Sequence, residues 1–456
     1  MQKKQELETM TKKLAPLSLA MVAMLAGCSM IPAYERPAAP VPTNYTAASV
    51  QTGAPLPSWR NYFSEPRLQQ LIELALDHNR DLRIASLNVE QARAQFQVRR
   101  AAQYPAVGLA ANASRAPASG SGDLTNSFSV GLAVTAWELD FFGRVASLKE
   151  QALAQYLASE EGRNAAQVSL ISAVANGWLT LLADEQLLEL SRQTLATREE
   201  SVRLTKLRLD SGAASELDYR QAESLTQAAR ATLAQQQRQR ALDENALALL
   251  LGQPLPEDIR ASLSRSDLRA APSMQAIPAG LPSDLLAQRP DIRQAEQQLV
   301  AANANIGAAR AAFFPRIALT AQAGTASGEL SGLFKNGSWG FTLAPSLLLP
   351  LLDTGANQAN LDSAQVGRKL AVAQYEKSIQ TAFREVSDAL ASQSTLTEQL
   401  DAQTKQAEAE AIRLNLADLR YKNGVASYLD LLDAQRSRCS TQQGVVQVRL
   451  GQVQNQ

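Results

Sequence analysis

The chain repeats itself, and this repeat limits the folds open to it more than any other feature. The segment Asp81–Pro105 resembles Asp291–Pro315 without a gap. A second segment, Arg208–Asp218, resembles Arg420–Asp430 at nearly the same spacing. Chance could produce one such match, but hardly two at nearly one spacing. The protein is therefore predicted to contain two copies of one structural unit of about 210 residues.

The two copies set the predicted domain boundaries. The first copy is expected over residues 61–252 and the second over residues 281–456, with a proline-rich linker at residues 253–280. Residues 28–60 are rich in Pro, Ala and Thr and show no periodicity, which is typical of an extended tether.

Both copies contain long tracts without proline, a residue that breaks helix interiors. In the first copy, apolar residues recur at three- and four-residue steps from Val168 to Leu181. Residues 145–209 are predicted to form one nearly continuous helix, roughly 100 Å long at about 1.5 Å per residue. Helices of this length without a transmembrane stretch usually pack as coiled coils.

Each copy also contains two short segments in which apolar residues alternate with small or polar ones. This alternation over about ten residues is typical of transmembrane β-barrel strands. For any one strand, a sandwich edge or a half-buried hairpin remains an alternative. Aromatic residues such as Tyr104, Trp137 and Trp339 lie near the strand ends, and membrane interfaces favour them. Strands are predicted near residues 104–113, 127–137, 314–323 and 339–350, with Gly/Ser-rich loops at residues 114–126 and 324–338.

Four strands are too few to close a barrel, and an open sheet edge cannot lie in lipid. If the strands span a membrane, they must therefore close with strands of other chains. Three chains would supply twelve strands, an even number within the known range. The predicted fold is mainly α, with a transmembrane β-barrel built by several chains.

The N-terminus is predicted to be a targeting segment. Two lysines precede the apolar run Leu14–Met24, which is too short to span a bilayer. The run leads into Leu25-Ala26-Gly27-Cys28, which resembles a bacterial lipobox. Residues 1–27 would then be a lipoprotein signal peptide, and Cys28 would carry the lipid. The alternative is a plain signal peptide with an incidental cysteine.

Composition and charge exclude several classes of function. Lys and Arg number 44 and Asp and Glu number 44, so the basic face that a nucleic-acid binder needs is not indicated. One histidine, His78, and two cysteines, Cys28 and Cys439, cannot build a zinc site or a Cys–His nucleophile within one chain. A hydrolase with a carboxylate pair stays open, although no nucleophile elbow or phosphate loop supports it. We expect no enzyme activity, no metal and no cofactor. His78 is expected at a helix end, and Cys439 on a helix without a redox partner.

Several motifs together resemble the TolC family of outer membrane efflux proteins, and within it the OprM-like lipoprotein ducts of resistance–nodulation–division multidrug and solvent pumps. The resemblance runs from the lipobox to the last residues. It rests on Leu25–Cys28, Asn79–Leu82, Ala136–Arg144, Ala279–Leu286 with Arg289-Pro290-Asp291, and Leu431–Arg436.

This resemblance implies a homotrimer with a twelve-stranded barrel in the outer membrane and a helical tunnel through the periplasm. Residues 253–280 would belong to an equatorial collar. An inner-membrane resistance–nodulation–division pump would load the duct, a periplasmic membrane-fusion adaptor would bridge the two, and the duct would conduct passively. Ser29 after the lipobox fits sorting to the outer membrane. The family continues past the position of Gln456, so a truncated C-terminus is expected.

One rival interpretation is a lipid-anchored periplasmic adaptor or scaffold protein, which would also be a lipoprotein with a helical hairpin. Such a protein would lack the duplicated strands and would carry a lipoyl-like β half.

Two Gly-x-x-Ser turns join long predicted helices in the two copies. Glycine suits a left-handed helix C-cap and serine suits the next N-cap, so the motif has a purely local explanation. The family resemblance implies in addition that the turns form the periplasmic tip that binds the adaptor. The residues concerned are Gly212, Ala213, Ala214, Ser215, Gly424, Val425, Ala426 and Ser427.

Two aspartates after the second turn are candidates for a constriction. Asp430 and Asp433 lie three residues apart and so share a helix face. A surface pair of this kind is usually a solvated face or a partner of the helix dipole. The resemblance implies that they line the periplasmic aperture as carboxylate rings, with Leu429 as a hydrophobic ring beside them. The aperture is then predicted to favour cations.

The resemblance also implies a latch between neighbouring coils. Tyr421 and Asp218 match a tyrosine–aspartate link in the family. An arginine that joins this network in TolC itself is Ala426 here, so this part of the latch must differ. Loss of the Tyr421–Asp218 link is predicted to open the aperture.

Overall fold

The structure is a computed structural model that describes residues 29–42, 45, 58–117, 124–263, 268 and 288–456. The predicted signal peptide 1–27 and the lipidation residue Cys28 lie outside the described residues, as does much of the predicted tether and linker.

The chain forms two compact units, and each is built from both sequence repeats. We name one the strand unit, because it holds the sheet, and the other the turn unit, because it holds both Gly-x-x-Ser turns. The strand unit comprises Met1–Pro40, Ser86–Gly162 and Pro290–Ile379, and the turn unit comprises Val41–Ala85, Arg163–Arg289 and Gln380–Gln456.

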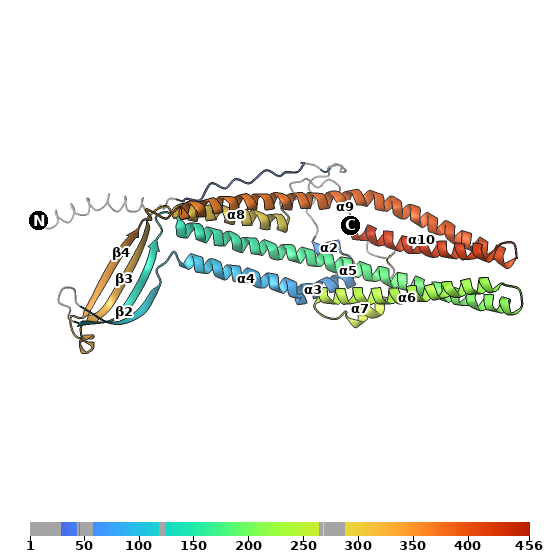
Figure 1. Ribbon diagram of the computed structural model, residues 1–456, viewed down its shortest axis with the longest axis horizontal. Coiled ribbons are helices and arrows are strands. Elements are labelled where there is room, and N and C mark those ends of the chain that lie inside the picture. The colour runs from blue at the N-terminus through green and yellow to red at the C-terminus, as the bar shows by residue number, and fades with distance from the viewer. Residues whose placement is uncertain (1–28, 43–44, 46–57, 118–123, 264–267, 269–287) are drawn as a thin grey trace. The chain divides into compact units, whose positions relative to one another are not determined.

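The helices confirm the predicted duplication (Figure 1). Helices α4 (Arg80–Ala101) and α8 (Pro290–Ala311) have the same length and occupy matching positions of the two copies. Helices α5 (Arg144–Asp210) and α9 (Ala356–Lys422) each have 67 residues and also match in position. The α5 bounds agree with the helix predicted over residues 145–209. The helices after the turns, α6 (Glu216–Leu251) and α10 (Tyr428–Gln454), begin at matching positions as well.

Four antiparallel strands form one sheet in the order β1-β2-β3-β4. They are β1 (Val107–Pro117), β2 (Leu124–Leu139), β3 (Arg316–Ser327) and β4 (Trp339–Leu348). The predicted loop at residues 114–126 is largely wrong, because β1 and β2 stay paired from Ser114↔Ser127 to Pro117↔Leu124. Backbone pairing with the neighbouring strand overrides the turn preference of these small polar residues. The predicted loop at residues 324–338 is shorter for the same reason, and contains a 3-10 turn, η4 (Leu330–Gly332).

A β-bulge interrupts the join between β2 and β3. The register shifts between Val134 and Trp137, and Ala136 has a φ of 49°. The backbone N–H of Ala136 donates to Oγ1 of Thr320 at 3.3 Å instead of to a ladder carbonyl. The bulge places one extra residue within the second strand of the first repeat, ahead of its long helix.

The core of the turn unit forms around α5. Trp178 and Leu181 of α5 are fully buried beside Leu68, Leu71 and Ile72 of α3 (Pro66–His78). The same cluster includes residues of α6 and of α7 (Glu257–Ser262), and α2 (Trp59–Tyr62) packs against it.

The predicted apolar face of α5 contributes most of its residues to this core, with one exception. Val174, Trp178 and Leu181 are buried as their spacing predicts, but Val168 is 57% exposed. Among the described residues, α5 is the one helix long and apolar enough to cross a membrane, and 39% of its apolar stretch is buried. Buried core helices of soluble proteins meet the same criterion, so this property is weak evidence for a span.

Candidate functional site at the helical turns and the sheet

The two Gly-x-x-Ser turns have one backbone geometry. Gly212 and Gly424 have φ values of +76° and +74°, in the left-handed region that glycine favours. After α5, the N–H of Ala213 donates to the carbonyl of Arg208 at 2.7 Å, and that of Gly212 donates to Leu209 at 2.9 Å. This pair of bonds is a Schellman motif, and the same pair recurs after α9. The predicted glycine C-caps are confirmed.

Each turn then starts the next helix with a capping box. Ser215 Oγ accepts a hydrogen bond from the N–H of Asp218 at 3.1 Å, and the Ser215 N–H donates to the Asp218 carboxylate at 3.2 Å. Ser427 and Asp430 repeat both bonds at 3.2 and 3.1 Å. The serine N-caps are confirmed. The capping role of the two aspartates was missed, although Ser-x-x-Asp, a short form of the capping-box pattern, stands in both repeats.

Tyr421 and Asp218 do not meet within one chain. The Asp218 carboxylate is held by its own turn, while the Tyr421 hydroxyl accepts a hydrogen bond from Nη1 of Arg208. The Arg208 guanidinium also lies 4.9 Å from the centre of the Tyr421 ring, as a cation–π pair. Tyr421 therefore joins the end of α9 to the end of α5, beside the first turn.

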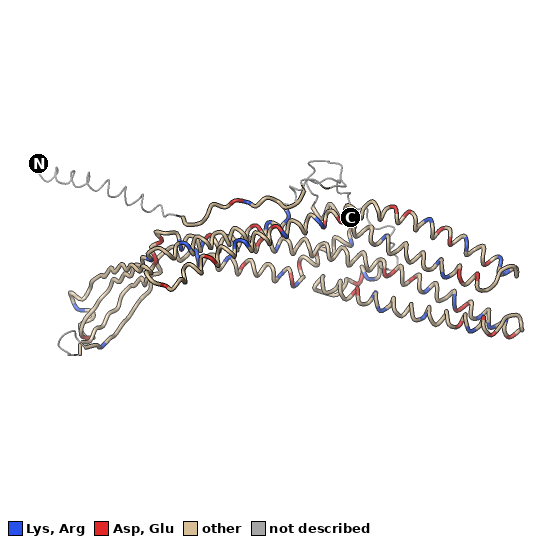
Figure 2. Tube along the Cα trace, turned by 45° about the horizontal axis from the view of Figure 1, so that its top comes forward, with Lys and Arg blue, Asp and Glu red and all other residues tan. Residues whose placement is uncertain are grey.

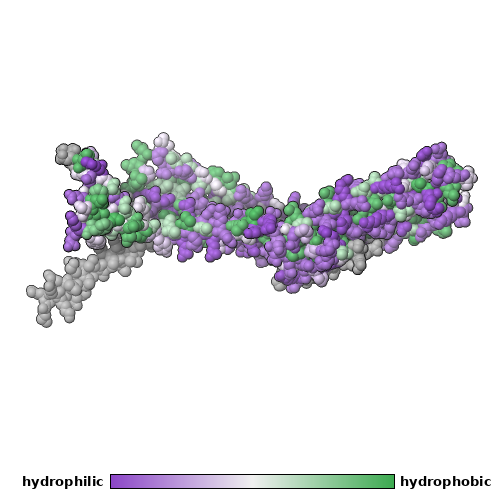
Figure 3. All heavy atoms as spheres, turned by 90° about the horizontal axis from the view of Figure 1, so that it is seen from below, coloured by the Kyte–Doolittle hydropathy of each residue, from purple (hydrophilic) through white to green (hydrophobic). Residues whose placement is uncertain are grey.

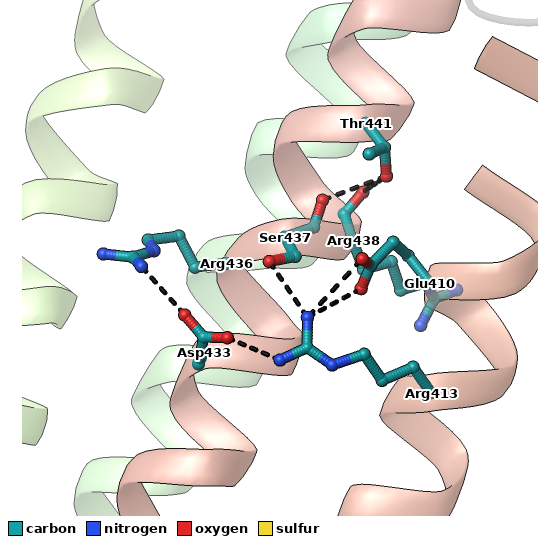
Figure 4. A network of polar contacts seen from close by, with 7 residues as sticks. All are labelled: Glu410, Arg413, Asp433, Arg436, Ser437, Arg438 and Thr441. Carbon is teal, nitrogen blue, oxygen red and sulfur yellow. Dashed lines mark hydrogen bonds and ion pairs between the residues drawn. The ribbon is translucent and has the colours of Figure 1, made fainter. Parts of the chain in front are cut away.

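Asp433 lies in a network of charged side chains between α9 and α10 (Figure 4). Nη2 of Arg413 is 2.5 Å from one oxygen of Asp433, and Nη2 of Arg436 is 2.8 Å from the other. Arg413 also contacts Glu410 at 3.1 Å. The hydrogen bond from Arg413 is the main cause that lowers the pKa of Asp433, so this carboxylate stays ionised. Asp433 therefore carries its charge beside two cations, which the spacing of the aspartates did not reveal.

Most of the other predicted site residues are exposed in the single chain, and four are half-buried: Ala214, Asp218, Tyr421 and Ala426. Leu429 is 62% exposed and Val425 is 67% exposed. A Cβ added to Gly212 or Gly424 would meet no atom within 4 Å. The turns thus present backbone and small side chains at an unobstructed surface.

A polar contact between α5 and α10 was not predicted. Arg198 is 7% exposed, and its Nη1 donates to Oε1 of Gln435 at 2.6 Å. Burial lowers the pKa of this guanidinium. One turn away, Oγ1 of Thr194 lies 3.4 Å from Sγ of Cys439. Cys439 is half-buried on α10 and His78 ends α3, and both placements were predicted.

The sheet is the second candidate site. Its strands hold three charged residues, Arg115, Glu138 and Arg316, and Figure 2 shows charge concentrated instead along the helices. Hydrophobic side chains gather over the strands on the face seen in Figure 3. The most exposed apolar residues of the strands are 61 to 77% exposed: Leu109, Phe341, Leu348, Trp339, Leu347, Val107 and Leu343.

In the part of the chain that the structure describes, no group of three or more His, Cys, Asp or Glu side chains could hold a metal ion. The charged clusters join helices to one another, and the sheet offers apolar surface.

Comparison with known proteins identifies the family. The profile of the family "Outer membrane efflux protein" matches residues 71–253 and 281–456. Two relatives from Pseudomonas putida, the antibiotic efflux pump outer membrane protein ArpC and the toluene efflux pump outer membrane protein TtgC, are each 45% identical over 458 residues. The alignments cover 97% of this chain and 93% of each relative.

A solved structure has the same fold. The outer membrane channel MtrE of Neisseria gonorrhoeae, in its open state, superposes with a TM-score of 0.83 and is 40% identical. The match covers 94% of this chain and 96% of that one. The relatives are channel and efflux proteins and not enzymes. The chain belongs to the outer membrane efflux protein family and has the fold of its TolC-like channels, as the sequence motifs predicted.

Proposed function

We propose that three copies of this chain form the outer membrane channel of a tripartite efflux pump. The channel passively conducts solvents, antibiotics and similar small molecules from the periplasm to the exterior. The observation that carries the proposal is the sheet, which has an exposed apolar surface, almost no charge and two open edges. Such a sheet is stable in lipid only when other copies close it into a barrel.

The cargo classes come from the relatives. ArpC is named for antibiotics and TtgC for toluene, and both are 45% identical to this chain over nearly its whole length. The turns and the constriction carry small and charged residues that contact one another, which favours breadth of cargo over selection. Selection would then lie in the inner-membrane pump.

The two turns are the proposed contact surface for a periplasmic adaptor, which links the channel to a resistance–nodulation–division pump. Their support is local geometry: both turns are fixed by Schellman bonds and capping boxes, and both are unobstructed. A surface fixed before binding loses little conformational entropy when a partner docks. The proposed contacts are Gly212, Ala213, Ala214, Ser215, Gly424, Val425, Ala426 and Ser427.

The proposed aperture consists of Leu429, Asp430, Asp433, Tyr421 and Asp218. Within one chain, Asp433 is bound by Arg413 and Tyr421 by Arg208, so the ends of neighbouring helices are held together. We propose that these contacts hold the duct closed, so that opening would have to break or exchange them. The Tyr421–Asp218 link stays part of the proposal, although each of these residues has another partner within the single chain.

Cys28 is the proposed lipid anchor, after a signal peptide at residues 1–27. The described chain begins next to it, and the carbonyl of Met30 accepts a hydrogen bond from Arg310 at 3.4 Å. Arg310 lies in the last turn of α8, shortly before β3 begins at Arg316. Met30, two residues after Cys28, thus lies at the end of α8 that leads into β3. We also propose that the two repeats extend over residues 61–252 and 281–456.

A gel and a susceptibility assay test this function together. Membrane extracts run in mild detergent should give a trimer that heating converts to the monomer. A host lacking its own outer membrane channel should become more resistant to toluene and to antibiotics when the chain is expressed with its pump and adaptor. A protein that stays monomeric in outer membranes, or that leaves susceptibility unchanged as a trimer, would contradict the proposal.

A further inference from the structure

We propose that the sheet carries a binding site for small organic anions at the end where its strands meet the helices. In this site Arg316 binds the anionic group, and Phe314 and Leu348 contact the apolar body of the same molecule. The inference goes beyond the proposed function, because all of these residues belong to the strand unit of one chain. Only the placement of the site in a lumen rests on the proposed channel.

The two faces of the sheet differ in character. Side chains alternate between the faces along each strand, and residues directly opposite each other in the register share a face. Leu109, Leu132 and Phe341 share one face through their pairings, and we name it the apolar face. Gln322 and Thr342 oppose each other on the other face, which we name the polar face.

The β-bulge moves Glu138 from the apolar face to the polar face. Leu132 and Glu138 are six residues apart, so an uninterrupted strand would place both on the apolar face. Between Val134 and Trp137, however, β2 takes three residue steps where β3 takes two. As a result Trp137 lies on the apolar face, and Glu138 lies on the polar face opposite Ala318. Bulges that re-aim a side chain in this way are frequent beside functional sites.

Arg316 lies on the polar face as well and meets Glu138 there. It precedes Ala318 by two residues in β3, so both side chains point to one face. Its Nε is 2.7 Å from Oε2 of Glu138. Arg144, in the first turn of α5, binds the same carboxylate through Nε and Nη2 at 2.8 and 2.5 Å. The Glu138 side chain is only 11% exposed, so one largely enclosed carboxylate contacts two guanidinium groups.

A pocket of about 240 Å³ lies beside this charged cluster. Its lining includes the three charged residues of the cluster together with apolar residues from the adjoining turns and strand ends. Two of the lining residues, Phe142 and Phe314, stack with their ring centres 4.9 Å apart. Leu348 also lines the pocket; it is paired directly with Arg316 in the sheet and is 71% exposed. The pocket thus sets apolar side chains next to a cation.

The charge of Arg316 is not fully balanced by the cluster. Two guanidinium groups share one carboxylate, which leaves one positive charge. Asp140 lines the same pocket, but its carboxylate accepts a hydrogen bond from the N–H of Ala146 at 2.7 Å and forms no ion pair with Arg316 among the described residues. The Arg316 side chain is 57% exposed, and its contact with Glu138 is through Nε. Because a guanidinium has five N–H donors, the two Nη nitrogens are left for an anion.

This combination fits one class of ligand. The excess positive charge disfavours cations and metal ions. An uncharged hydrocarbon would cover the Arg316 guanidinium without offering it an acceptor, which costs free energy. A molecule with an apolar body and one sulfonate, carboxylate or phosphate group would pair with Arg316 and bury its body against Phe314 and Leu348. The pocket is smaller than most sites for drug-sized ligands, so it suits a ring system or a lipid head group.

Exported molecules and membrane phospholipids both include anions of this chemistry. The side of the sheet on which Arg316 lies favours the exported molecules. In a transmembrane barrel with a polar interior, the apolar face meets lipid and the polar face lines the lumen. If the proposed barrel forms, Arg316 therefore lies along the path of the cargo.

Calorimetric titration of the purified protein in a nonionic detergent tests the site. The probes are naphthalenesulfonate, its uncharged analogue naphthylmethanol, and the water-soluble phospholipid dihexanoylphosphatidylglycerol. We expect the sulfonate to saturate one site per chain and to bind at least about tenfold more tightly than the alcohol, because a hydrogen bond to a charged group is worth roughly this factor. The titration needs no assembled channel, so its failure would leave the proposed function standing. A monomer that binds the sulfonate would leave the site standing and contradict the channel.

Two variants locate the binding. Arg316→Gln should remove the preference for the sulfonate over the alcohol. Arg115→Gln is the matched control, because Arg115 is an exposed arginine of the same sheet that does not line the pocket. Leu348→Glu keeps Arg316 and Glu138 and sets a new carboxylate beside the guanidinium, where it should compete with the sulfonate and weaken its binding by a similar factor.

Each outcome decides a different point. Tight binding of the phospholipid that depends on Arg316, without binding of the sulfonate, would keep the site and make the membrane the source of its ligand. If the parent protein binds the sulfonate no more tightly than the alcohol and does not bind the phospholipid, the proposed site is wrong. That comparison needs no variant, so it holds even if Arg316→Gln disturbs the fold. Unchanged binding in both Arg316→Gln and Leu348→Glu would show that the charged cluster only joins β2 and β3 to α5.

Discussion

Ser427 and Asp430 close a hydrogen-bonded ring at the start of α10, each side chain bonded to the backbone N–H of the other residue. Ser215 and Asp218 form the same ring at the start of α6, the matching helix of the first repeat. The two turns thus share one geometry, and each engages the carboxylate of an aspartate that the proposed aperture includes. This constraint bears directly on how the constriction can work, because the Asp430 carboxylate already has two donors in its own turn.

Removing a cap should loosen one turn without unfolding the chain. Ser427→Ala is expected to cost about 1 kcal/mol, because the N–H of Asp430 loses its acceptor. Hydrogen exchange should speed up at the first turn of α10 and stay unchanged at the start of α6. Ser427→Thr, which keeps the hydroxyl, is the control. Equal protection in the Ala and Thr variants would show that the ring contributes nothing.

Substitution of the glycine in the second turn should be limited by the backbone conformation there and not by the space around it. Gly424 has a φ of +74°, and a Cβ there would meet no atom within 4 Å. Gly424→Asn should therefore be tolerated, whereas Gly424→Val should cost about 1 to 2 kcal/mol, because β-branched residues avoid this region. Pull-down of the adaptor by the trimer measures the effect. Equal loss of adaptor with both variants would point to a steric requirement instead.

Arg413 should control the charge and the closure of the constriction. Arg413→Ala removes the main cause that lowers the pKa of Asp433 and breaks the ion pair between α9 and α10. We expect higher conductance and a stronger preference for cations than in the parent channel. Lys405→Ala is the control, because Lys405 pairs with Asp401 on its own helix. If the variant has the conductance and the ion selectivity of the parent, Asp433 does not line the aperture.

The stability of the turn unit should depend on pH through Asp184. This side chain is 6% exposed, and burial, followed by the hydrogen bond to Asp243 and its charge, raises its pKa to about 7, with Arg240 opposing and Glu185 adding to the shift. Because the folded pKa exceeds the unfolded value, the folded state keeps a proton that the unfolded state releases between about pH 4 and 7. The free energy of unfolding should therefore fall over this window, by at most about 4 kcal/mol.

Asp184→Asn should remove that dependence, because the amide mimics the protonated acid. The melting temperature of the variant should match the parent near pH 4 and exceed it at pH 8. Glu189→Gln, at a position of the same helix where the carboxylate is half exposed, is the control. A variant that is destabilised equally at both pH values would show that Asp184 is ionised in the fold.

Much of the fold could be predicted from the sequence because the repeat and the periodicities are local signals. The spacings of the two sequence matches reappear in the bounds of α4 and α8 and of α5 and α9. Val168 shows the limit: its spacing places it with the core residues, yet the single chain leaves it 57% exposed. Spacing identifies a helix face, but not which part of that face another segment covers.

The sequence predicted only those parts of the site in which the interacting residues are close together in the chain and their residue types indicate the interaction. Gly212 and Ser215 are neighbours in one turn, so their caps follow from the residue types. The contact of Asp433 with Arg413 joins two helices, and that of Arg198 with Gln435 joins helices from different repeats. No short sequence pattern encodes such pairs, because they depend on the alignment of two long antiparallel helices.

Conductance across a planar lipid bilayer tests the central claim most directly. The purified trimer should give small, discrete conductance steps. A variant with Arg413→Ala and Tyr421→Phe should give larger steps, because the Arg413–Asp433 ion pair and the Arg208–Tyr421 hydrogen bond are lost. If both proteins insert as heat-sensitive trimers and neither conducts, the chain is not a channel subunit.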